Sequence, residues 1–440
     1  MTASERRLGV LPLTLFTGGI LLYLLVSPPL LTALNIPYDA PKGNFVFKLH
    51  PGTYVVFLAF AMAHLTRGNP LTSLWRSMAG AKQIALYGMT VSCIFLYELA
   101  RFGTSGPAFI IDTLLMPAVC ALFLQLVDRR MLRFFLGLVI AVVTMNAALG
   151  IGESILHRRI VPYTVSGGVV LKEDAFRSTA LMGHPLVNAL ITGTTLFFCL
   201  ALPLNALFRG ALMGILLLGL LSFGGRTSLA ITSVVLGVYL AYGALRRLLA
   251  GQLSYVQITG GLVGVFVGLG ALAGAVLLTG VGERIFSHMK WDRSADVRIH
   301  VWLALRYMSR SDILFGISVK QIQAITYRLG LEYPLSTIEN FWLLMLMNMG
   351  AIGLGFFVWS LANVCWRYGS MNVPGVRAAL IVFLVAASSN NSLCSKTCCL
   401  VLLFVLLQCA RSYAPPADRR VGPLRAAPVP PTPKLAGAGA

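Results

Sequence analysis

Long uninterrupted apolar runs constrain the fold of this chain more than any other feature. A helix that crosses the roughly 30 Å hydrocarbon layer of a bilayer needs about 20 apolar residues, and runs of that length recur along the 440 residues. Only 11% of the residues are charged and 57% are hydrophobic, whereas soluble globular proteins carry about 25% charged residues. The sequence therefore predicts an all-α polytopic membrane protein.

Counting the apolar runs gives about twelve candidate transmembrane helices. Their predicted ranges are 8–26, 51–65, 83–100, 107–127, 131–150, 185–204, 207–223, 226–245, 256–280, 338–363, 376–392 and 397–411. The second and the last are short, so ten or eleven crossings are the alternatives. The first run is followed by prolines and not by a small-residue cleavage site, which indicates a transmembrane helix and not a signal peptide.

The distribution of basic residues predicts the orientation of these helices. With the N-terminus in the cytoplasm, the short loops placed inside hold Arg67, Arg76, Lys82, Arg129, Arg130, Arg133, Arg209, Arg246, Arg247, Arg367 and Arg377. The short turns placed outside hold far fewer basic residues, namely Lys42, Lys48, Arg101, Arg226 and Lys396. This bias favours twelve crossings with both termini cytoplasmic. It also attributes the net charge of +20 to orientation and to contact with anionic membrane lipids, because basic residues this dispersed do not indicate nucleic-acid binding.

Two long segments fall outside the membrane in this arrangement, residues 151–184 and residues 281–337. Loops of such length usually carry function, and we expect the second to be a periplasmic loop with short helices inside a single transmembrane domain, residues 1–411. The tail, residues 412–440, is rich in proline, alanine and glycine. We expect it to be a disordered cytoplasmic end.

Part of the second long segment has the pattern of an amphipathic helix. Val297, Val301, Leu305 and Met308 recur at helical spacing in SADVRIHVWLALRYM. Such a stripe predicts a helix that lies at the membrane surface.

One arginine, Arg226, stands alone in one of the most apolar parts of the chain. No other charged residue lies between Ala211 and Leu245, and a continuous helix over that range would be about 52 Å long, too long for one crossing. The glycine pair in SFGGRTS predicts a tight helical hairpin, with Thr227 and Ser228 capping its second helix. Arg226 would then lie at the outer mouth of the hairpin.

An arginine beside a helix N-terminus suits an anion, because the free amide groups and the guanidinium fork both match phosphate oxygens. Arg177 and Arg298 are predicted on the same side of the membrane as Arg226. The three residues are therefore candidates to share a pyrophosphate. The alternative for Arg226 is an interaction with lipid headgroups.

Four sequence motifs, taken in order, resemble bacterial O-antigen ligases and Wzy-type polysaccharide polymerases. They are FRSTALMGHPLVNA, SFGGRTSLA, ADVRIHVWLAL and TIENFWLLMLMNMGAIGLGFFV, and they cover about residues 170–365. These families are multispanning glycosyltransferases of the GT-C type. The resemblance implies transfer of a glycan from an undecaprenyl-diphosphate-linked donor to a glycan or lipid acceptor, on the periplasmic face of the bacterial inner membrane, without cofactor or metal.

The resemblance also implies roles for individual residues. Arg226, Arg298 and then Arg177 are the best matches to the arginines that bind the diphosphate in these families. Where ligases usually have His-Asn, this chain has Glu339 and Asn340, which is more similar to polymerases of the superfamily. Glu339 could accept the proton of the acceptor hydroxyl; its other interpretation is a carboxylate that stabilises a helix N-terminus.

Further polar residues are secondary candidates. His300 is the second candidate for the base, because the usual histidine is missing, and Arg306 and His184 are placed near the site. Asn188 is expected to hydrogen-bond between helices, as amides commonly do in membranes. A structural ion pair or a substrate role is predicted for three residues near the outer ends of the third and fourth helices: Glu98, Arg101 and Asp112.

Three functions follow from these observations. The first is polymerisation of the lipid-linked oligosaccharide into exopolysaccharide, capsule or O-antigen. The second is ligation of the glycan to lipid A core or to protein. The third, from another class, is transport, which also uses charged residues inside membranes. The absence of a recognisable sequence repeat and the gathering of charges on one face favour the enzymes.

Overall fold

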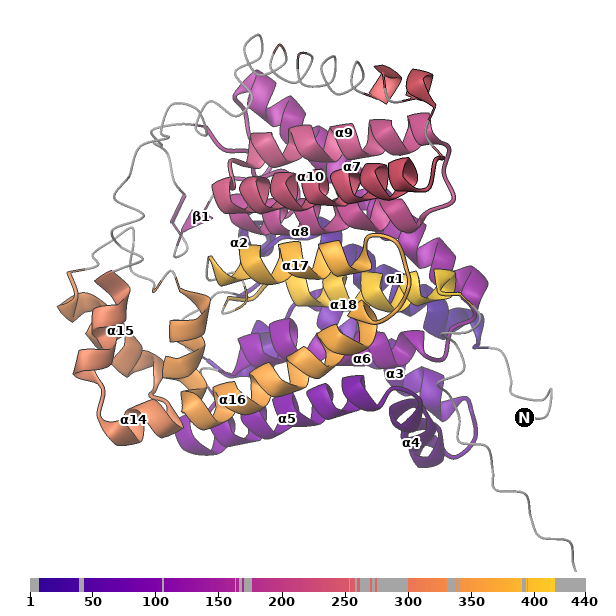
Figure 1. The fold of residues 1–440 in the computed structure, drawn as a ribbon. Coiled ribbons are helices and arrows are strands. Elements are labelled where there is room, and N and C mark those ends of the chain that lie inside the picture. The colour runs from indigo at the N-terminus through magenta and orange to yellow at the C-terminus, as the bar shows by residue number, and fades with distance from the viewer. Residues whose placement is uncertain are drawn as a thin grey trace, which may run out of the picture.

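The chain folds into a bundle of helices, seen in a computed structural model (Figure 1). Within the part that the structure describes, the β-structure is one antiparallel pair, β1 (Thr164–Val165) with β2 (Gly168–Val169). The described residues are 8–38, 43–104, 107–162, 164–165, 168–169, 176–252, 254–257, 259–261, 270, 274, 300–330, 338, 340–389, 393 and 395–415.

The helices of the first third of the chain follow the predicted apolar runs closely. They are α1 (Val10–Leu25), α2 (Pro28–Ala33), η1 (Phe45–Lys48), α3 (Pro51–Leu65), α4 (Pro70–Gly80), α5 (Lys82–Phe102), the π-helix η2 (Ile110–Leu115), α6 (Met116–Leu124) and α7 (Arg129–Leu156). Of these, α2, η1 and α4 lie between the predicted membrane helices.

The rest of the chain is also helical. Its elements are α8 (Pro185–Phe198), η3 (Cys199–Ala201), α9 (Ala206–Phe223), α10 (Arg226–Leu249), η4 (Val301–Tyr307), α14 (Arg310–Phe315), α15 (Val319–Arg328), α16 (Phe341–Gly369), α17 (Val376–Ser388), α18 (Cys399–Ala410) and η5 (Arg411–Tyr413). Eleven of the twelve predicted runs thus coincide with helices, and most of the twelfth, 256–280, lies outside the described residues.

Five of the described helices are long and apolar enough to cross a membrane: α5, α7, α9, α10 and α16. Six shorter apolar helices accompany them, at Val10–Leu25, Pro51–Leu65, Ile110–Gln125, Pro185–Ala201, Val376–Ser388 and Cys399–Tyr413. The protein therefore has the helices of a membrane protein.

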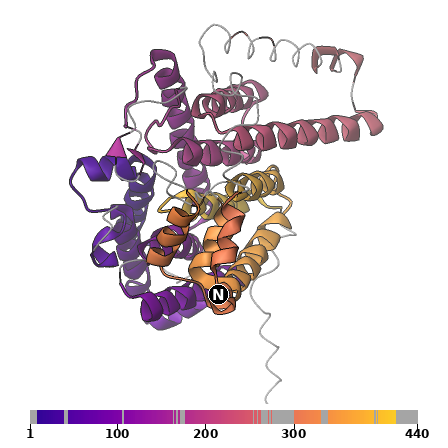
Figure 2. The same cartoon turned by 90° about the vertical axis from the view of Figure 1, so that its left-hand side faces the viewer.

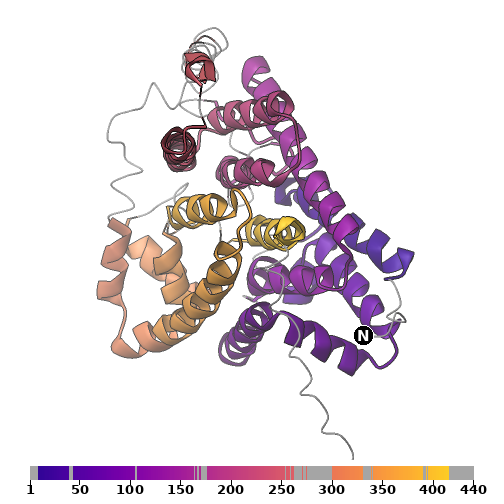
Figure 3. The same ribbon diagram turned by 45° about the vertical axis from the view of Figure 1, so that its right-hand side comes forward.

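The helix α18 forms the centre of the bundle (Figure 3). All of its residues, Cys399 to Ala410, are buried, and it packs against α6, α7 and α8. A helix that is apolar on every face is stable only where other helices or lipid cover it. Here the other helices cover it.

The ends of α6 and α18 show how the bundle is ordered. At the start of both helices, the Thr113 hydroxyl donates to the Ser395 carbonyl at 2.8 Å. At the end of both, Arg411 Nη1 donates to Gln125 Oε1 at 2.6 Å. The two helices therefore run parallel. The residues predicted outside the membrane lie at one end of this pair, and those predicted inside lie at the other end.

The described part of the segment 281–337 packs against the start of α16. Figure 2 looks onto the end of the bundle where η4, α14 and α15 lie, coloured orange. The backbone of α16 is kinked at Gly350, whose φ is 69°, and Gly316 approaches it with a φ of 78°. The Ile317 N–H donates to the Met347 carbonyl at 2.7 Å. Only glycine permits the close approach of the chain at Gly316 and Gly350, because a Cβ atom on either residue would overlap the backbone of the other segment.

The amphipathic surface helix predicted around Val301 is wrong for the part described. Residues 301–307 form a short 3-10 helix, and Val301 and Met308 are buried with residues of α15 and α16. Their apolar stripe is covered by the protein itself and not by lipid. Val297 lies outside the described residues.

The ordered chain extends slightly beyond the predicted start of the tail. Arg411–Tyr413 form η5, and Ser412 and Ala414 are buried against the bundle. Burial of these side chains fixes the chain as far as residue 415, so the predicted boundary at 412 is too early. Residues 416–440 lie outside the described part.

Candidate functional site

The turn between α9 and α10 has the predicted form of a tight helical hairpin. Gly224 ends α9 in the left-handed conformation, with a φ of 64°, and its N–H donates to the Leu221 carbonyl at 3.0 Å. A Cβ atom at Gly225 would lie 2.5 Å from the Cβ of Ala189 in α8, so only glycine fits there. Arg226 is the first residue of α10.

The predicted capping of α10 is wrong. Its N-cap is Gly225, and no side chain caps the helix. Because the helix already begins at Arg226, Thr227 and Ser228 fall within its first turn and cannot precede it. The two glycines make the turn so short that no residue is left for a side-chain cap.

A backbone hydrogen bond of the neighbouring residue, Ser178, brings the segment of Arg177 to this hairpin. The N–H of Ser178 donates to the carbonyl of Ser222, in the last turn of α9, at 3.2 Å. Arg177 and Arg226 are both half-buried, and the Nε atom of each is buried. The structure thus joins two segments that are separated by about 50 residues in the sequence and that carry two of the predicted diphosphate-binding arginines.

A buried carboxylate, Glu153 near the end of α7, holds the loop that carries Arg177. Glu153 is 2% exposed. Its Oε1 accepts from the Ile160 N–H at 2.6 Å, and its Oε2 accepts from the N–H groups of Thr179 and Ala180, each at 2.9 Å. Three amide donors satisfy a buried charge that would otherwise be costly.

Hydroxyl groups of the same loop tie it to α7 and to the chain after α7. The Ser178 hydroxyl donates to the Gly150 carbonyl at 2.6 Å, and the Thr179 hydroxyl donates to the Val161 carbonyl at 2.5 Å. Both serine and threonine side chains are fully buried. The loop is therefore fixed from both sides, and its neighbour Arg177 is fixed with it.

Two amides complete this buried polar network between α7 and α8. Asn146 Nδ2 donates to Asn188 Oδ1 at 2.7 Å, which confirms the predicted interhelical hydrogen bond of Asn188. Asn146 Oδ1 accepts from the Leu181 N–H at 2.9 Å, and Asn188 Nδ2 donates to the Thr179 carbonyl at 2.6 Å. Each amide thus serves both the helix pair and the loop.

A third arginine at this place, Arg159, was not predicted. Its Nε donates to the carbonyl of Arg177 at 3.0 Å, and its guanidinium lies over the ring of Phe176, 4.8 Å from the centroid. The signal in the sequence was the pair of arginines in HRRIV, within the long segment predicted outside. Nothing in the sequence linked that pair to Arg177.

His184 caps α8 and is electrically neutral at neutral pH. Its Nδ1 accepts from the Leu186 N–H at 3.3 Å. Burial, and then the positive charge of Arg177, lower the pKa of His184 to about 4. The histidine therefore fixes the start of α8 beside Arg177, as a positioned residue and not a base.

The remaining predicted residues belong to other elements. Asn340 caps α16, with its Oδ1 accepting from the Leu343 N–H at 3.1 Å. His300 precedes η4 and Arg306 lies within it, and both are exposed. Since η4 packs against the start of α16, these three residues lie in one region. Arg298 and Glu339 lie outside the described residues.

The predicted grouping of Glu98, Arg101 and Asp112 is only partly correct. Arg101 attracts the carboxylate of Glu98 electrostatically and donates to a carbonyl of α14. Asp112 belongs to another cluster, because its Oδ2 accepts from the His50 N–H at 3.0 Å and its Oδ1 from the Thr53 hydroxyl at 2.5 Å. The Asp112 carboxylate is therefore hydrogen-bonded by donors at the start of α3 and not by Arg101.

Within the described ranges, no three histidine, cysteine, aspartate or glutamate side chains are grouped closely enough to hold a metal ion.

Comparison with known proteins leaves the functional assignment to the site itself. No protein-family model matches the sequence, and no curated protein matches it. The arginines at this helix end, and the motifs in which they occur, are therefore the features of the chain that bear on its function.

Proposed function

We propose that this chain is a glycosyltransferase that polymerises an undecaprenyl-diphosphate-linked oligosaccharide into exopolysaccharide, capsule or O-antigen. The observation that supports this best is the hydrogen bond from Ser178 to Ser222, which brings the segment of Arg177 to the hairpin of Arg226. Arg159 adds a third guanidinium group. Permanently charged forks beside a helix N-terminus suit the oxygens of a diphosphate.

The proposal places the protein in the bacterial inner membrane, with about twelve transmembrane helices, both termini in the cytoplasm and the site on the periplasmic face. The five long apolar helices and the six shorter ones support this arrangement. The hairpin of Arg226 opens at an end of α9 and α10 predicted to face the periplasm, where a lipid-linked glycan would be presented.

The proposed reaction is a displacement at the anomeric carbon of the donor. A hydroxyl oxygen of the acceptor glycan forms the new bond to that carbon, the bond to undecaprenyl diphosphate breaks, and its electron pair leaves with the diphosphate. Guanidinium groups of Arg226, Arg177 and Arg298 stabilise the negative charge that develops there. Glu339 accepts the proton of the attacking hydroxyl, with His300 as the alternative base.

Other residues have a positioning role in this proposal. Asn340 and His184 each cap the helix that follows them, so they fix the helix starts next to Glu339 and Arg177 in the sequence. Arg306, exposed on η4, is available to the acceptor glycan. The ligase alternative uses the same chemistry and differs in the acceptor alone.

Reconstitution with purified lipid-linked repeat units tests the proposal. A polymerase converts them into longer lipid-linked chains, which are separated by gel electrophoresis. Product that forms only when lipid A core is supplied would show that the chain is a ligase and not a polymerase. If the reconstituted and folded chain transfers no glycan to either acceptor, both the polymerase and the ligase assignments are excluded.

Variants of Arg226 test its role in the same assay. Arg226→Ala and Arg226→Lys should each lower the transfer rate by roughly 10²- to 10³-fold, because a point charge does not replace the bidentate fork. Arg246→Ala, at the exposed far end of α10, is the matched control and should keep full activity. Full activity in Arg226→Ala would contradict a role in transfer and would favour the alternative that Arg226 contacts lipid headgroups.

A further inference from the structure

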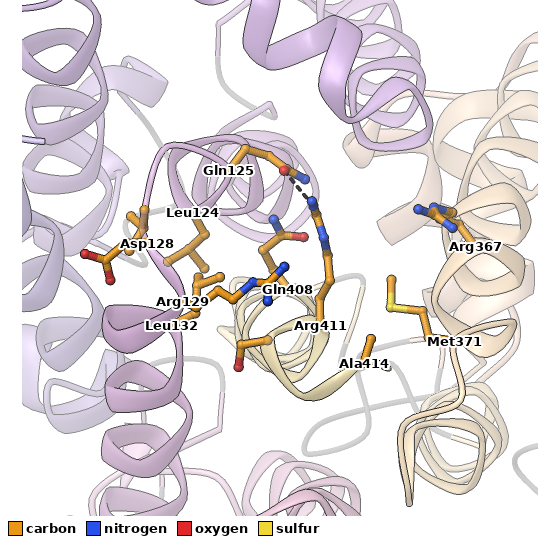
Figure 4. A pocket seen from close by; sticks show the side chains of 12 residues that line it. Leu124, Gln125, Asp128, Arg129, Leu132, Arg367, Met371, Gln408, Arg411 and Ala414 are labelled. Atoms are coloured by element: carbon orange, nitrogen blue, oxygen red, sulfur yellow. Dashed lines mark hydrogen bonds between the residues drawn. The ribbon is translucent and has the colours of Figure 1, made fainter. Parts of the chain in front are cut away.

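A second arginine-rich site lies at the opposite end of the bundle from Arg226. A pocket of about 270 Å³ opens where the turn between α6 and α7 meets the end of α16 and the chain after α18 (Figure 4). It is lined by Leu124, Gln125, Val127, Asp128, Arg129, Leu132, Arg367, Met371, Gln408, Arg411, Ser412 and Ala414.

Three arginines, Arg129, Arg367 and Arg411, line this pocket, which we call the arginine pocket. Arg411 lies close enough to Arg367 and to Arg129 to be repelled by both positive charges. The single carboxylate in the lining is Asp128, whose Oδ1 accepts from the Met131 N–H at 2.9 Å as the cap of α7. Figure 4 shows that carboxylate turned away from the guanidinium groups. The lining thus has an excess of positive charge.

The two side-chain amide oxygens of the lining are already engaged with protein donors. Gln125 Oε1 accepts from Arg411 at 2.6 Å, and Gln408 Oε1 accepts from the Tyr368 hydroxyl. The Ser412 hydroxyl is buried, with 2% of the residue exposed, and has no hydrogen-bond partner among the residues described. What the pocket offers a ligand is therefore donors and positive charge.

We propose that the arginine pocket binds a phosphate group, carried either by the headgroup of an anionic phospholipid or by free inorganic phosphate. Guanidinium forks match phosphate oxygens in geometry and charge, and an anion offsets the repulsion of Arg411 by Arg129 and by Arg367. The volume of about 270 Å³ lies just below the range of roughly 300–1,000 Å³ for drug-sized ligands, which suits a headgroup or a small ion. The inference does not depend on the proposed glycosyl transfer.

Thermal unfolding of the purified full chain in detergent tests this site. Phosphatidylglycerol should raise the midpoint of unfolding and phosphatidylcholine should not, since ligands that bind the folded state stabilise it. Arg367→Gln should weaken the binding of phosphatidylglycerol, titrated by this shift, by on the order of tenfold or more. The double variant Arg246→Gln with Arg247→Gln, on the exposed end of α10, is the control and should bind normally.

Inorganic phosphate distinguishes the two sources of the ligand. A saturable shift with phosphate alone, lost in Arg367→Gln, assigns the pocket to the free ion, whereas a shift with phosphatidylglycerol alone assigns it to a lipid. A shift with neither, or shifts that Arg367→Gln leaves intact, would overturn the proposal.

The stability of the variant without ligand gives an independent readout. Arg367→Gln removes like-charge repulsion, so the ligand-free variant should unfold at the same temperature as the unsubstituted chain or at a higher one. If Arg367→Gln does not fold, Ser412→Ala takes its place and should weaken binding by a few-fold. Unchanged binding in that folded variant would count against the proposed contact.

Discussion

Glu153 is the residue on which the geometry of the candidate site depends most. It lies at the end of α7, yet it orders the loop of residues 176–184 through the N–H groups of Thr179 and Ala180. Those residues directly follow Arg177 and Ser178, which reach the hairpin of α9 and α10. A carboxylate without catalytic function in the proposal thus helps to place Arg177, the arginine that the proposal assigns to the diphosphate.

Replacing Glu153 by glutamine should destabilise the protein by about 1–3 kcal/mol. Glutamine has one acceptor oxygen, so its NH₂ group must face either the Ile160 N–H or the two loop N–H groups. Asp128→Asn, at the other end of α7, is the matched control, since asparagine caps a helix as well as aspartate does. The midpoint of thermal unfolding in detergent measures both variants, and equal midpoints would show that Glu153 does not anchor the loop.

His184 should make the stability of the protein depend on pH. In the unfolded chain this imidazole binds a proton below about pH 6.5, but in the folded protein its pKa is about 4. Between these values the unfolded state binds more protons, so stability is lost as the pH falls from 6.5 towards 4, by up to about 1.4 kcal/mol per pH unit.

The variant His184→Asn isolates this contribution, because asparagine keeps an acceptor for the helix cap and does not titrate. Its unfolding midpoint should fall less steeply between pH 6.5 and 4 than that of the unsubstituted chain. Some slope should persist, since burial also lowers the pKa of His50 to about 4. Identical slopes in the two proteins would contradict the assignment.

At the scale of elements, the hairpin of α9 and α10 depends on close packing against α8. Gly225→Ala should separate the start of α10 from Ala189, because the new Cβ would lie 2.5 Å from that side chain. We expect a loss of about 1–3 kcal/mol of stability, together with a loss of glycan transfer, since Arg226 follows directly.

The control for this substitution lies in the same helix. A Cβ at Gly237 meets no atom within 4 Å, so Gly237→Ala should keep activity and raise stability by roughly 0.5–1 kcal/mol through helix propensity. Thermal unfolding and the transfer assay, applied to both variants, separate close packing from general intolerance of alanine. Equal behaviour of the two would refute the packing argument.

The elements themselves were largely predictable from the sequence, because an apolar run of sufficient length specifies a helix wherever it is placed. The run 51–65 coincides with α3, and the predicted starts of α8 and α10 are correct. The helix ends that depend on neighbours were less predictable. In the described part of the predicted surface helix, residues 301–307 form the 3-10 helix η4, because Val301 and Ala304 pack against residues of α15 and α16.

At the scale of the whole molecule, the proposed orientation predicts which loops face the periplasm. Ile160, which is 56% exposed, lies in the long segment predicted outside. Leu207, which is 86% exposed, is the first residue of the predicted crossing 207–223, at the end predicted to face the cytoplasm. In intact cells a membrane-impermeant thiol reagent should label Ile160→Cys, and it should label Leu207→Cys only after the membrane is opened. Cys93, an exposed native thiol, is replaced by serine in both. The reverse labelling pattern would invert the topology.

The sequence by itself determined the membrane class, the positions of most helices and the hairpin at Arg226. These follow from chain length, hydropathy and glycine, which act locally and need no knowledge of neighbours. The tertiary structure decided which segments meet: it joined Arg177 to the hairpin through Ser178 and Ser222, and it added Arg159 and Glu153. It also gathered three arginines in a pocket at the other end. Such contacts depend on how the helices pack, and buried polar groups take whichever partners that packing brings within reach.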